Sequence, residues 1–170
     1  ISTDPFKYMS KEDKRKIRSL MRKYESAVEH NCYNSTDNLD DLLEKVFILD
    51  QSSAKYMKNK SLFVNEHNRE FYRNLVKTYK DTFQISFIYK NGTPIGYDLG
   101  LTIRNKFIGY QTSYLREYKK LSPGKMSVVY LLEKLKDTGV DIFDFCAGMA
   151  SYKLEFTSKY ALQYDFLLSR

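Results

Sequence analysis

The segment of residues 106–145, KFIGYQTSYLREYKKLSPGKMSVVYLLEKLKDTGVDIFDF, decides the fold of this 170-residue chain. Residues 106–114 are rich in β-branched and aromatic side chains and predict a strand. Residues 125–137 place apolar side chains at helical spacing, so they predict a helix that stops at Gly139. Residues 140–145 predict a second, short strand. A strand, a helix and a strand in this order predict a right-handed crossover between two parallel strands.

Upstream of this crossover, the sequence predicts an antiparallel meander. Residues 84–90 (QISFIYK) and 94–103 (PIGYDLGLTI) have the composition of strands. They flank Asn91-Gly92, a dipeptide typical of tight hairpins because both residues tolerate a positive φ. A second tight turn at 104–106 connects this hairpin to the first strand of the crossover, so the meander has three strands.

The remaining elements are predicted from the spacing of apolar residues. Segments with apolar residues at helical spacing precede the meander, and one more helix and one more strand follow the crossover. The first helix opens at a capping box, Ser10 and Asp13, and carries its apolar stripe from Ile17 to Val28. The other elements are helices at 39–58, 65–80 and 150–158, a polar turn at 31–38 and a last strand at 161–168. The chain is therefore predicted to be one α/β domain over residues 1–170, mostly helical over 1–80, with a mixed sheet covered by helices on both faces over 81–170.

Composition favours a globular protein of the cytoplasm. Hydrophobic residues make up 42% of the chain and charged residues 29%, which excludes a disordered chain. No run of about 20 apolar residues predicts a membrane span, and the first residues lack the apolar segment of a secretory signal. Cys32 and Cys146 are far apart and have no zinc-type spacing, so we expect reduced thiols and no metal site.

The positive charge is concentrated in one window of the sequence. The net charge is +7, and residues 104–125 contain six basic side chains against one acid, Glu117, which gives this window a charge of +5. A local excess of this kind favours an anionic partner: the phosphates of a cofactor, a nucleic acid or an acidic surface. The alternative is a solvated basic face without a ligand.

The start of the crossover helix is the candidate phosphate site. Backbone N–H groups at a helix N-terminus and the helix dipole favour an anion. Ser122 and Gly124 lie at this terminus, and Gly124 permits close approach of a ligand. Lys119, Lys120 and Lys125 add positive charge around it. The alternative is that Ser-Pro-Gly only caps the helix.

Carboxylates of the strands supply the candidate chemistry. Asp144 lies at the carboxyl end of a strand, where open α/β sheets bind ligands. It is either an acid–base group or a carboxylate that caps the next helix or pairs with Lys153, and the sequence leaves both open. Asp98 shares a strand face with small residues that could line a groove; the alternative is a side chain that faces solvent.

Several short motifs stand in one order along the chain: Ser122-Pro123-Gly124, Gly139-Val140, Phe143-Asp144-Phe145, Gly148, Tyr152-Lys153 and Phe156. In this order they resemble the GNAT-fold acetyltransferase-like family that is associated with cellulose biosynthesis (CelD-type) and related to the Fem peptidyltransferases. The resemblance is firm over residues 65–158 and looser before them. It implies a GNAT fold and transfer of an acyl group from acetyl-CoA or another acyl-CoA to an amine or hydroxyl.

The resemblance also implies roles for the candidate residues. The pyrophosphate of CoA would lie at residues 122–125, although the family's loop, Q/R-x-x-G-x-G/A, is replaced here by KKLSPG. Asp144 would be the general base and Tyr152 would protonate the leaving thiolate. Lys153 and Asp98 would contact the substrate.

A non-catalytic GNAT-like module is the alternative function. Such a module would bind a polyanion through residues 104–125, where tyrosines lie among the basic residues, or it would bind a partner domain. A Fem-like protein would bind tRNA, and an enzyme would take a small-molecule or cell-envelope acceptor. These families often pair two GNAT-like halves in one chain, so the chain is alternatively the C-terminal half of a longer protein, with an N-terminal GNAT-like domain before it.

Overall fold

A five-stranded mixed sheet with strand order β1-β2-β3-β4-β5 is the centre of the fold. The computed structural model describes residues 10–24, 27–136, 138–148 and 150–157. The strands are β1 (Val28–Tyr33), β2 (Phe83–Lys90), β3 (Thr93–Ile103), β4 (Lys106–Tyr114) and β5 (Ile142–Asp144). Neighbouring strands from β1 to β4 are antiparallel, and β5 is parallel to β4. The predicted meander and crossover are confirmed, and the strand predicted at 161–168 lies outside the described residues.

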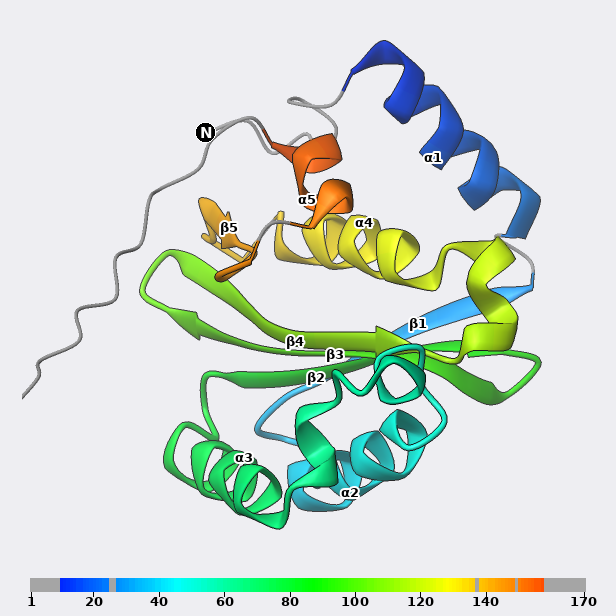
Figure 1. Ribbon diagram of the computed structural model, residues 1–170. Coiled ribbons are helices and arrows are strands. Elements are labelled where there is room, and N and C mark those ends of the chain that lie inside the picture. Colours follow the sequence, from blue (N-terminus) through cyan, green and yellow to red (C-terminus); the bar gives the residue numbers. More distant parts are fainter. Residues whose placement is uncertain (1–9, 25–26, 137, 149, 158–170) are drawn as a thin grey trace, which may run out of the picture.

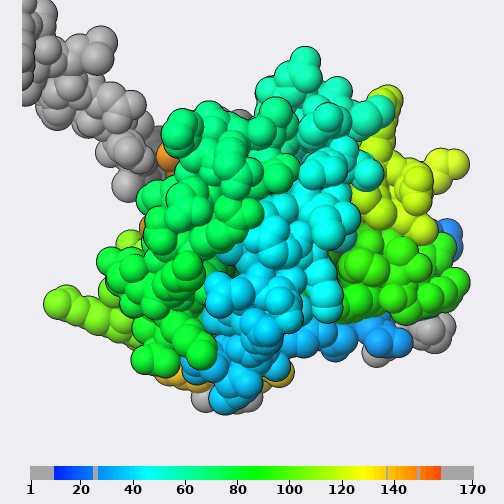
Figure 2. Space-filling model, turned by 90° about the horizontal axis from the view of Figure 1, so that it is seen from below, coloured from blue at the N-terminus to red at the C-terminus, as the bar shows by residue number. Residues whose placement is uncertain are grey.

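Helices cover both faces of the sheet, as predicted (Figure 1). α2 and α3 lie on one face, and α1, α4 and α5 lie on the other. Their bounds are α1 (Lys11–Tyr24), α2 (Leu39–Asp50), α3 (Glu66–Thr78), α4 (Pro123–Leu135) and α5 (Ser151–Phe156), with short 3-10 helices at Tyr56–Lys58, Leu62–Val64 and Arg116–Leu121. Figure 2 is a view of the first face, with α2 in cyan and α3 in green. None of the described helices has both the length and the apolar character that crossing a membrane requires.

Side chains along each strand point alternately to the two faces of the sheet, so each face has its own apolar core. Ile85, Phe87 and Leu99 are buried against α2 and α3. Ile88 is buried on the other face, where it packs in a cluster with Met126 of α4. Burial of each such side chain contributes roughly 1.5–3 kcal/mol, so both helix layers are held to the sheet mainly by apolar packing.

Strand β1 was not predicted by the sequence. Residues at 31–38 were expected to form a polar turn, but Val28–Tyr33 pairs along β2, with Val28 opposite Lys90 and Tyr33 opposite Ile85. The segment VEHNCY has weak strand propensity by itself. It becomes a strand because the outer edge of β2 presents unpaired backbone groups that a neighbouring chain segment can satisfy.

The second helix is also shorter than predicted, because it ends at Asp50 rather than near residue 58. Asp50 is buried, and its carboxylate accepts hydrogen bonds from Tyr97 Oη (2.6 Å), Ser53 Oγ (3.0 Å) and Ser61 Oγ. A buried carboxylate needs such donors. The chain leaves the helix and folds back so that Ser53 and Ser61 can supply them.

Candidate active site

A β-bulge lies in β4 just beyond the end of its pairing with β5. The two strands pair over only three residues, from Lys106 opposite Ile142 to Ile108 opposite Asp144. Directly after this point, the register of β4 with β3 shifts, and Tyr110 is the extra residue of β4. A bulge bends and twists its strand, and the pairing of β4 with β5 does not continue past this point.

A narrow pocket lies where the two strands separate. Its walls come from β3, β4, α4, β5 and α5, and combine aromatic rings with a few polar groups. The lining residues are Asp98, Phe107, Gly109, Gln111, Thr112, Val128, Leu131, Phe143, Phe145 and Tyr152. Its volume is about 20 Å³, far below the roughly 300–1,000 Å³ of a formed ligand pocket, so it marks where polar and aromatic groups converge rather than an open site. We call it the β4–β5 pocket.

Asp98 is the carboxylate of this pocket. Only 8% of the residue is exposed, and its Oδ2 accepts a hydrogen bond from Ser127 Oγ of α4. Burial raises the pKa of Asp98 to about 6, while hydrogen bonds from Ser127 and Thr112 and the charge of Lys55 oppose this rise. The alternative that Asp98 faces solvent is wrong. The hairpin register, which sets Asp98 opposite Thr112, carries it under α4.

Tyr152 of α5 also lines the pocket, as does its neighbour Phe145. The two rings meet edge to face, with centroids 6.4 Å apart. Burial raises the pKa of the Tyr152 hydroxyl above its ordinary value. The hydroxyl therefore stays protonated at neutral pH and is able to donate a proton or a hydrogen bond in the pocket.

Lys153 folds the loop after β5 around its ammonium group. Its Nζ donates to the carbonyl oxygens of Phe145 (2.7 Å), Cys146 (3.3 Å), Ala147 (2.9 Å) and Gly148 (3.1 Å). Cys146 and Gly148 have positive φ angles of 56° and 93°, which curl the loop. The predicted alternative of a Lys153–Asp144 pair is wrong, since Lys153 binds these carbonyls instead.

Asp144 lies at the end of β5, as predicted, but it is not among the residues that line the pocket. Its Oδ2 pairs with Lys106 Nζ at 3.2 Å, and its Oδ1 accepts from the backbone N–H of Cys146 at 2.8 Å. The side chain is 40% exposed. The carboxylate thus fixes the turn that follows β5, and the structure does not bring it together with Tyr152 in the pocket wall.

The predicted phosphate site is the N-terminus of α4. Gly124 is open on its outer side, since an added Cβ would meet only Tyr114 Cδ1, at 3.9 Å. Lys119 and Lys120 are exposed in the preceding 3-10 helix. Lys125, in contrast, is paired with Glu155 of α5, at 2.7 and 2.6 Å to its two oxygens. Ser122 has a left-handed conformation (φ 50°), and its side chain makes no cap hydrogen bond.

Sequence reasoning did not select Lys55, Gln111, Thr112 or Ser127. Lys55 Nζ donates to the side-chain oxygen of Gln111, which lines the pocket. Ser127 was detectable as the polar residue within the apolar run of α4, and Thr112 as the cross-strand partner of Asp98. Lys55 comes from the connection between α2 and α3, and no local pattern marks it.

No group of three or more His, Cys, Asp or Glu side chains that could hold a metal ion occurs among residues 10–24, 27–136, 138–148 and 150–157. Cys32 is half-buried, Cys146 is exposed, and both are free thiols. Burial raises the pKa of both thiols above the ordinary value, so neither is an activated nucleophile.

The sequence was compared with models of protein families and with curated proteins, and the family models gave a match. A family model described as an acetyltransferase (GNAT) domain matches residues 11–154. No curated protein sequence matches the chain.

Solved structures share the fold. An aminoglycoside acetyltransferase from an uncultured soil metagenomic sample, solved with sisomicin, has a TM-score of 0.62 and 11% identity over 86% of this chain and 99% of that chain. A GNAT family acetyltransferase of Staphylococcus aureus has a TM-score of 0.53 and 13% identity over 85% of this chain and 99% of that chain. The ribosomal-protein-S18-alanine N-acetyltransferase of Escherichia coli has a TM-score of 0.53 and 11% identity over 76% of this chain and 74% of that chain. At these identities, the likeness shows the fold alone.

Proposed function

Because the chain belongs to the acetyltransferase (GNAT) domain family, we propose that it transfers an acyl group from acyl-CoA to an amine or hydroxyl of an acceptor. The observation that carries this proposal is the β4–β5 pocket, where a buried carboxyl, Asp98, and a protonated phenol, Tyr152, line the same narrow space. An acid and a base that meet in one pocket are what acyl transfer needs.

The residues at the start of α4 fit the phosphates of an acyl-CoA. Gly124 leaves open space beside the helix N-terminus, and Lys119 and Lys120 are exposed cations next to it. The helix dipole adds to their attraction for an anion. Lys125 is less suited than the sequence predicts, because Glu155 already neutralises it. When bound, acyl-CoA supplies the activated acyl carbon.

In this proposal, Asp98 takes the role that the resemblance implies for Asp144. With a pKa of about 6, Asp98 is mostly ionised at pH 7 and above and can accept the proton of the acceptor. The acceptor atom forms a bond to the acyl carbon, and the carbon–sulfur bond breaks. The proton of the acceptor goes to Asp98, and the departing sulfur takes the proton of Tyr152.

Calorimetry and turnover test the proposal together. Acetyl-CoA and free CoA are titrated into the protein, and thiol release from acetyl-CoA is then followed with and without added amines. We expect acetyl-CoA to bind and thiol release to depend on the acceptor. A Gly124→Phe variant should lose binding, because its ring fills the open space beside the helix. Ile48→Ala, at an exposed position of α2, should keep it. Absence of binding to wild-type protein would refute the proposal.

A non-catalytic module is the second candidate, and one observation favours it. Arg116, Lys119 and Lys120 are exposed on one 3-10 helix, and none takes part in the ion pairs of the described residues. Such a face would bind a polyanion such as tRNA, as the Fem-like resemblance implies. Binding of tRNA that resists competition by acetyl-CoA and weakens steeply with salt would favour this function.

A further inference from the structure

The positive charge of the chain is concentrated in two elements that adjoin in the fold. α1 contains seven basic residues and two acids, and the 3-10 helix Arg116–Leu121 contains three basic residues and one acid. Their charges of +5 and +2 equal the +7 of the whole chain, so the remaining residues are neutral in total. A charge distribution this uneven produces a strong local field, which attracts a polyanion.

The basic residues of α1 are concentrated on its outer side. Ile17 is 2% exposed and packs in one cluster with Val128 of α4, so this side of α1 faces the protein. On the opposite side, four basic residues follow one another at intervals of about one helical turn and form a row roughly 16 Å long. They are Lys11, Arg15, Arg18 and Arg22, and all four are exposed.

Most of these charges have no counter-ion within the protein. Lys16 pairs with Glu12 at 2.6 Å. Arg15 and Arg22 take part in none of the ion pairs among the described residues. Arg22 donates to a backbone carbonyl of its own helix at 3.3 Å, so its charge is not neutralised. The row therefore presents positive charge to a partner.

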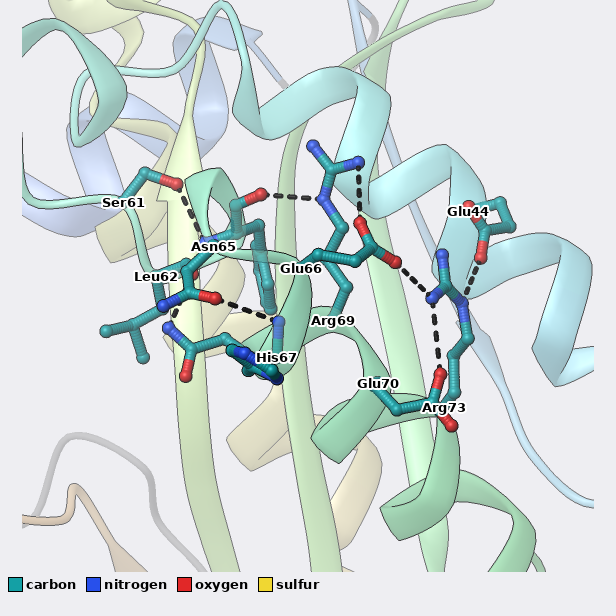
Figure 3. A network of polar contacts seen from close by, with 11 residues as sticks. Glu44, Ser61, Leu62, Asn65, Glu66, His67, Arg69, Glu70 and Arg73 are labelled. Carbon is teal, nitrogen blue, oxygen red and sulfur yellow. Dashed lines mark hydrogen bonds and ion pairs between the residues drawn. The ribbon is translucent and has the colours of Figure 1, made fainter.

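Arginines on the other face of the sheet are used differently. Arg73 of α3 binds Glu44 of α2 (2.8 Å) and Glu66 (2.7 Å) (Figure 3). Its neighbour Arg69 donates to the carbonyl oxygen of Phe63 (2.7 Å). This network secures α3 against α2. The contrast indicates that the exposed row on α1 does not serve to hold the fold together.

The basic surface continues beyond α1. Lys23 lies over the ring of Tyr24 (5.2 Å) at the end of α1, and Lys90 lies over the ring of Tyr118 (5.5 Å). Tyr24 and Tyr118 pack against one buried cluster, so the end of α1, the β2–β3 hairpin and the 3-10 helix adjoin one another (Figure 1). We call the exposed cations of α1 and of this 3-10 helix, together with Lys90, the basic surface.

The composition of the basic surface fits a nucleic acid better than a membrane. A helix that binds a lipid surface inserts apolar side chains between the headgroups. Within the part of the chain that the structure describes, α1 and the 3-10 helix expose no large apolar side chain, and the apolar side of α1 is covered by α4. Arginine supplies three of the four side chains in the row, and its planar guanidinium matches phosphate oxygens.

The shape of α1 favours DNA over RNA. α1 has 14 residues, and its outer side is free along the length of the helix (Figure 1). The major groove of B-form DNA is wide enough to admit an α-helix, whereas that of an A-form RNA duplex is deep and narrow. Glu12 and Ser19 are the exposed residues of α1 that are not basic, so few groups are present to read bases.

We propose that the basic surface binds double-stranded DNA, largely independently of its sequence, with the outer side of α1 in the major groove. The row on α1 binds phosphates along the groove, and Lys90 and the 3-10 helix bind the neighbouring backbone. This inference goes beyond the proposed acyl transfer and does not depend on it.

The test is a charge reversal on α1 with a matched reversal elsewhere. Binding of a labelled DNA duplex of mixed sequence is followed by fluorescence anisotropy at several salt concentrations. We expect the wild-type protein to bind with a Kd of about 1–100 µM at physiological salt, and the affinity to fall steeply as salt is added. Arg15→Glu/Arg22→Glu should weaken binding by at least about 10-fold and lower the slope of log K against log salt by about two. Lys77→Glu/Lys80→Glu has the same net charge but changes exposed residues at the end of α3, so it should bind like the wild type.

Several outcomes would overturn the inference. They are unchanged affinity in Arg15→Glu/Arg22→Glu, an equal loss in both double variants, and equal or tighter binding of an RNA duplex of the same sequence or of phosphatidylglycerol vesicles by the wild-type protein. The wild-type comparison decides the matter even if a variant does not fold. Acetyl-CoA is titrated in parallel, and we expect the α1 variant to bind it as the wild type does. If the wild type binds DNA but not acetyl-CoA, the proposed function fails and this inference stands.

Discussion

Asp98, the proposed general base, lowers the stability of the folded protein when it is ionised, because its carboxylate is buried. An ordinary aspartate has a pKa near 3.9, whereas that of Asp98 is about 6 in the folded protein. Between these values, the folded state binds more protons than the unfolded state. The stability that protonated Asp98 contributes is therefore present at low pH and is lost as the pH rises through about 6.

Asp98→Asn should therefore stabilise the protein and inactivate it. At pH 8, the gain in unfolding free energy should reach at most about 3 kcal/mol, and it should shrink toward pH 4. Turnover should fall by roughly 10²- to 10⁴-fold. Chemical denaturation over this pH range and thiol release measure the two effects. Asp144→Asn is the matched control; if it abolishes turnover while Asp98→Asn retains it, Asp144 is the base.

His30 on β1 should make the fold sensitive to acid. Burial, with the nearby charge of Lys134, lowers the pKa of His30 from 6.5 to about 4, and its ring stacks on Tyr130 at 5.3 Å. Between these pH values, His30 binds a proton in the unfolded chain but not in the folded one. The free energy of unfolding therefore falls as the pH drops from about 6.5 to 4, by roughly 3 kcal/mol in total.

Replacement of His30 isolates this effect, because Asp98 acts with the opposite sign in an overlapping range. We expect His30→Phe to remove the destabilising component, so that stability rises as the pH falls from 6.5 to 4. Urea unfolding at each pH measures this change. His67→Gln, at an exposed position of α3, should leave the profile as in the wild type. A wild-type profile in His30→Phe would count against the prediction.

At the scale of elements, local signals predicted the β2–β3 hairpin and the crossover helix well, but they placed the ends of α1 and α2 too late in the sequence. Asn91-Gly92 predicted the β2–β3 hairpin because both φ angles are positive, 50° and 76° in the structure. α4 begins and ends within two residues of the prediction. The bulge at Tyr110 escaped prediction, since it depends on how β3 and β4 pair. The burial of Asp98 escaped for the same reason.

The bulge itself should depend on Gly100, which faces Gly109 across the register shift. A Cβ at Gly100 would lie 2.2 Å from the ring of Phe107 and 2.8 Å from the carbonyl oxygen of Ile108. Gly100→Ala should therefore lower the unfolding free energy by about 1–3 kcal/mol, the usual cost of overpacking. Gly124→Ala, whose Cβ has space, should not destabilise the fold. Equal melting temperatures for the two variants would contradict this role.

At the scale of the whole molecule, the first helix supports the last one. Ile17 of α1 is 2% exposed and packs in one cluster with Val128 and Val129 of α4 and Phe156 of α5, against which Tyr152 also packs. A residue near the start of the chain thus supports the phenol of the β4–β5 pocket. The helical spacing predicted the apolar face of α1 but not its partner, because packing between distant segments leaves no local pattern.

Ile17→Ala should reveal this support. The variant should lose about 2–5 kcal/mol of unfolding free energy through the cavity that it creates. Its kcat should fall while its affinity for acetyl-CoA changes little, because α5 loosens and the start of α4 does not. Ile48→Ala, at a position of α2 that is 68% exposed, is the control. Unchanged kcat in a folded Ile17→Ala protein would contradict the proposed support.

The short pairing of β4 with β5 also bears on how easily another copy of the chain could add a strand to the sheet. Beyond Ile108, the outer edge of β4 has no partner strand among the described residues until its end, where Ala54 donates its backbone N–H to the carbonyl oxygen of Tyr114 and Ser53 bridges to Leu115. A straight, unpaired edge of this kind invites another chain to add a strand, which is the first step toward aggregates. The extra residue at Tyr110 breaks the regular spacing of hydrogen-bonding groups that such an addition needs. The irregularity beside the β4–β5 pocket thus also makes this edge a poor template for a strand from another copy.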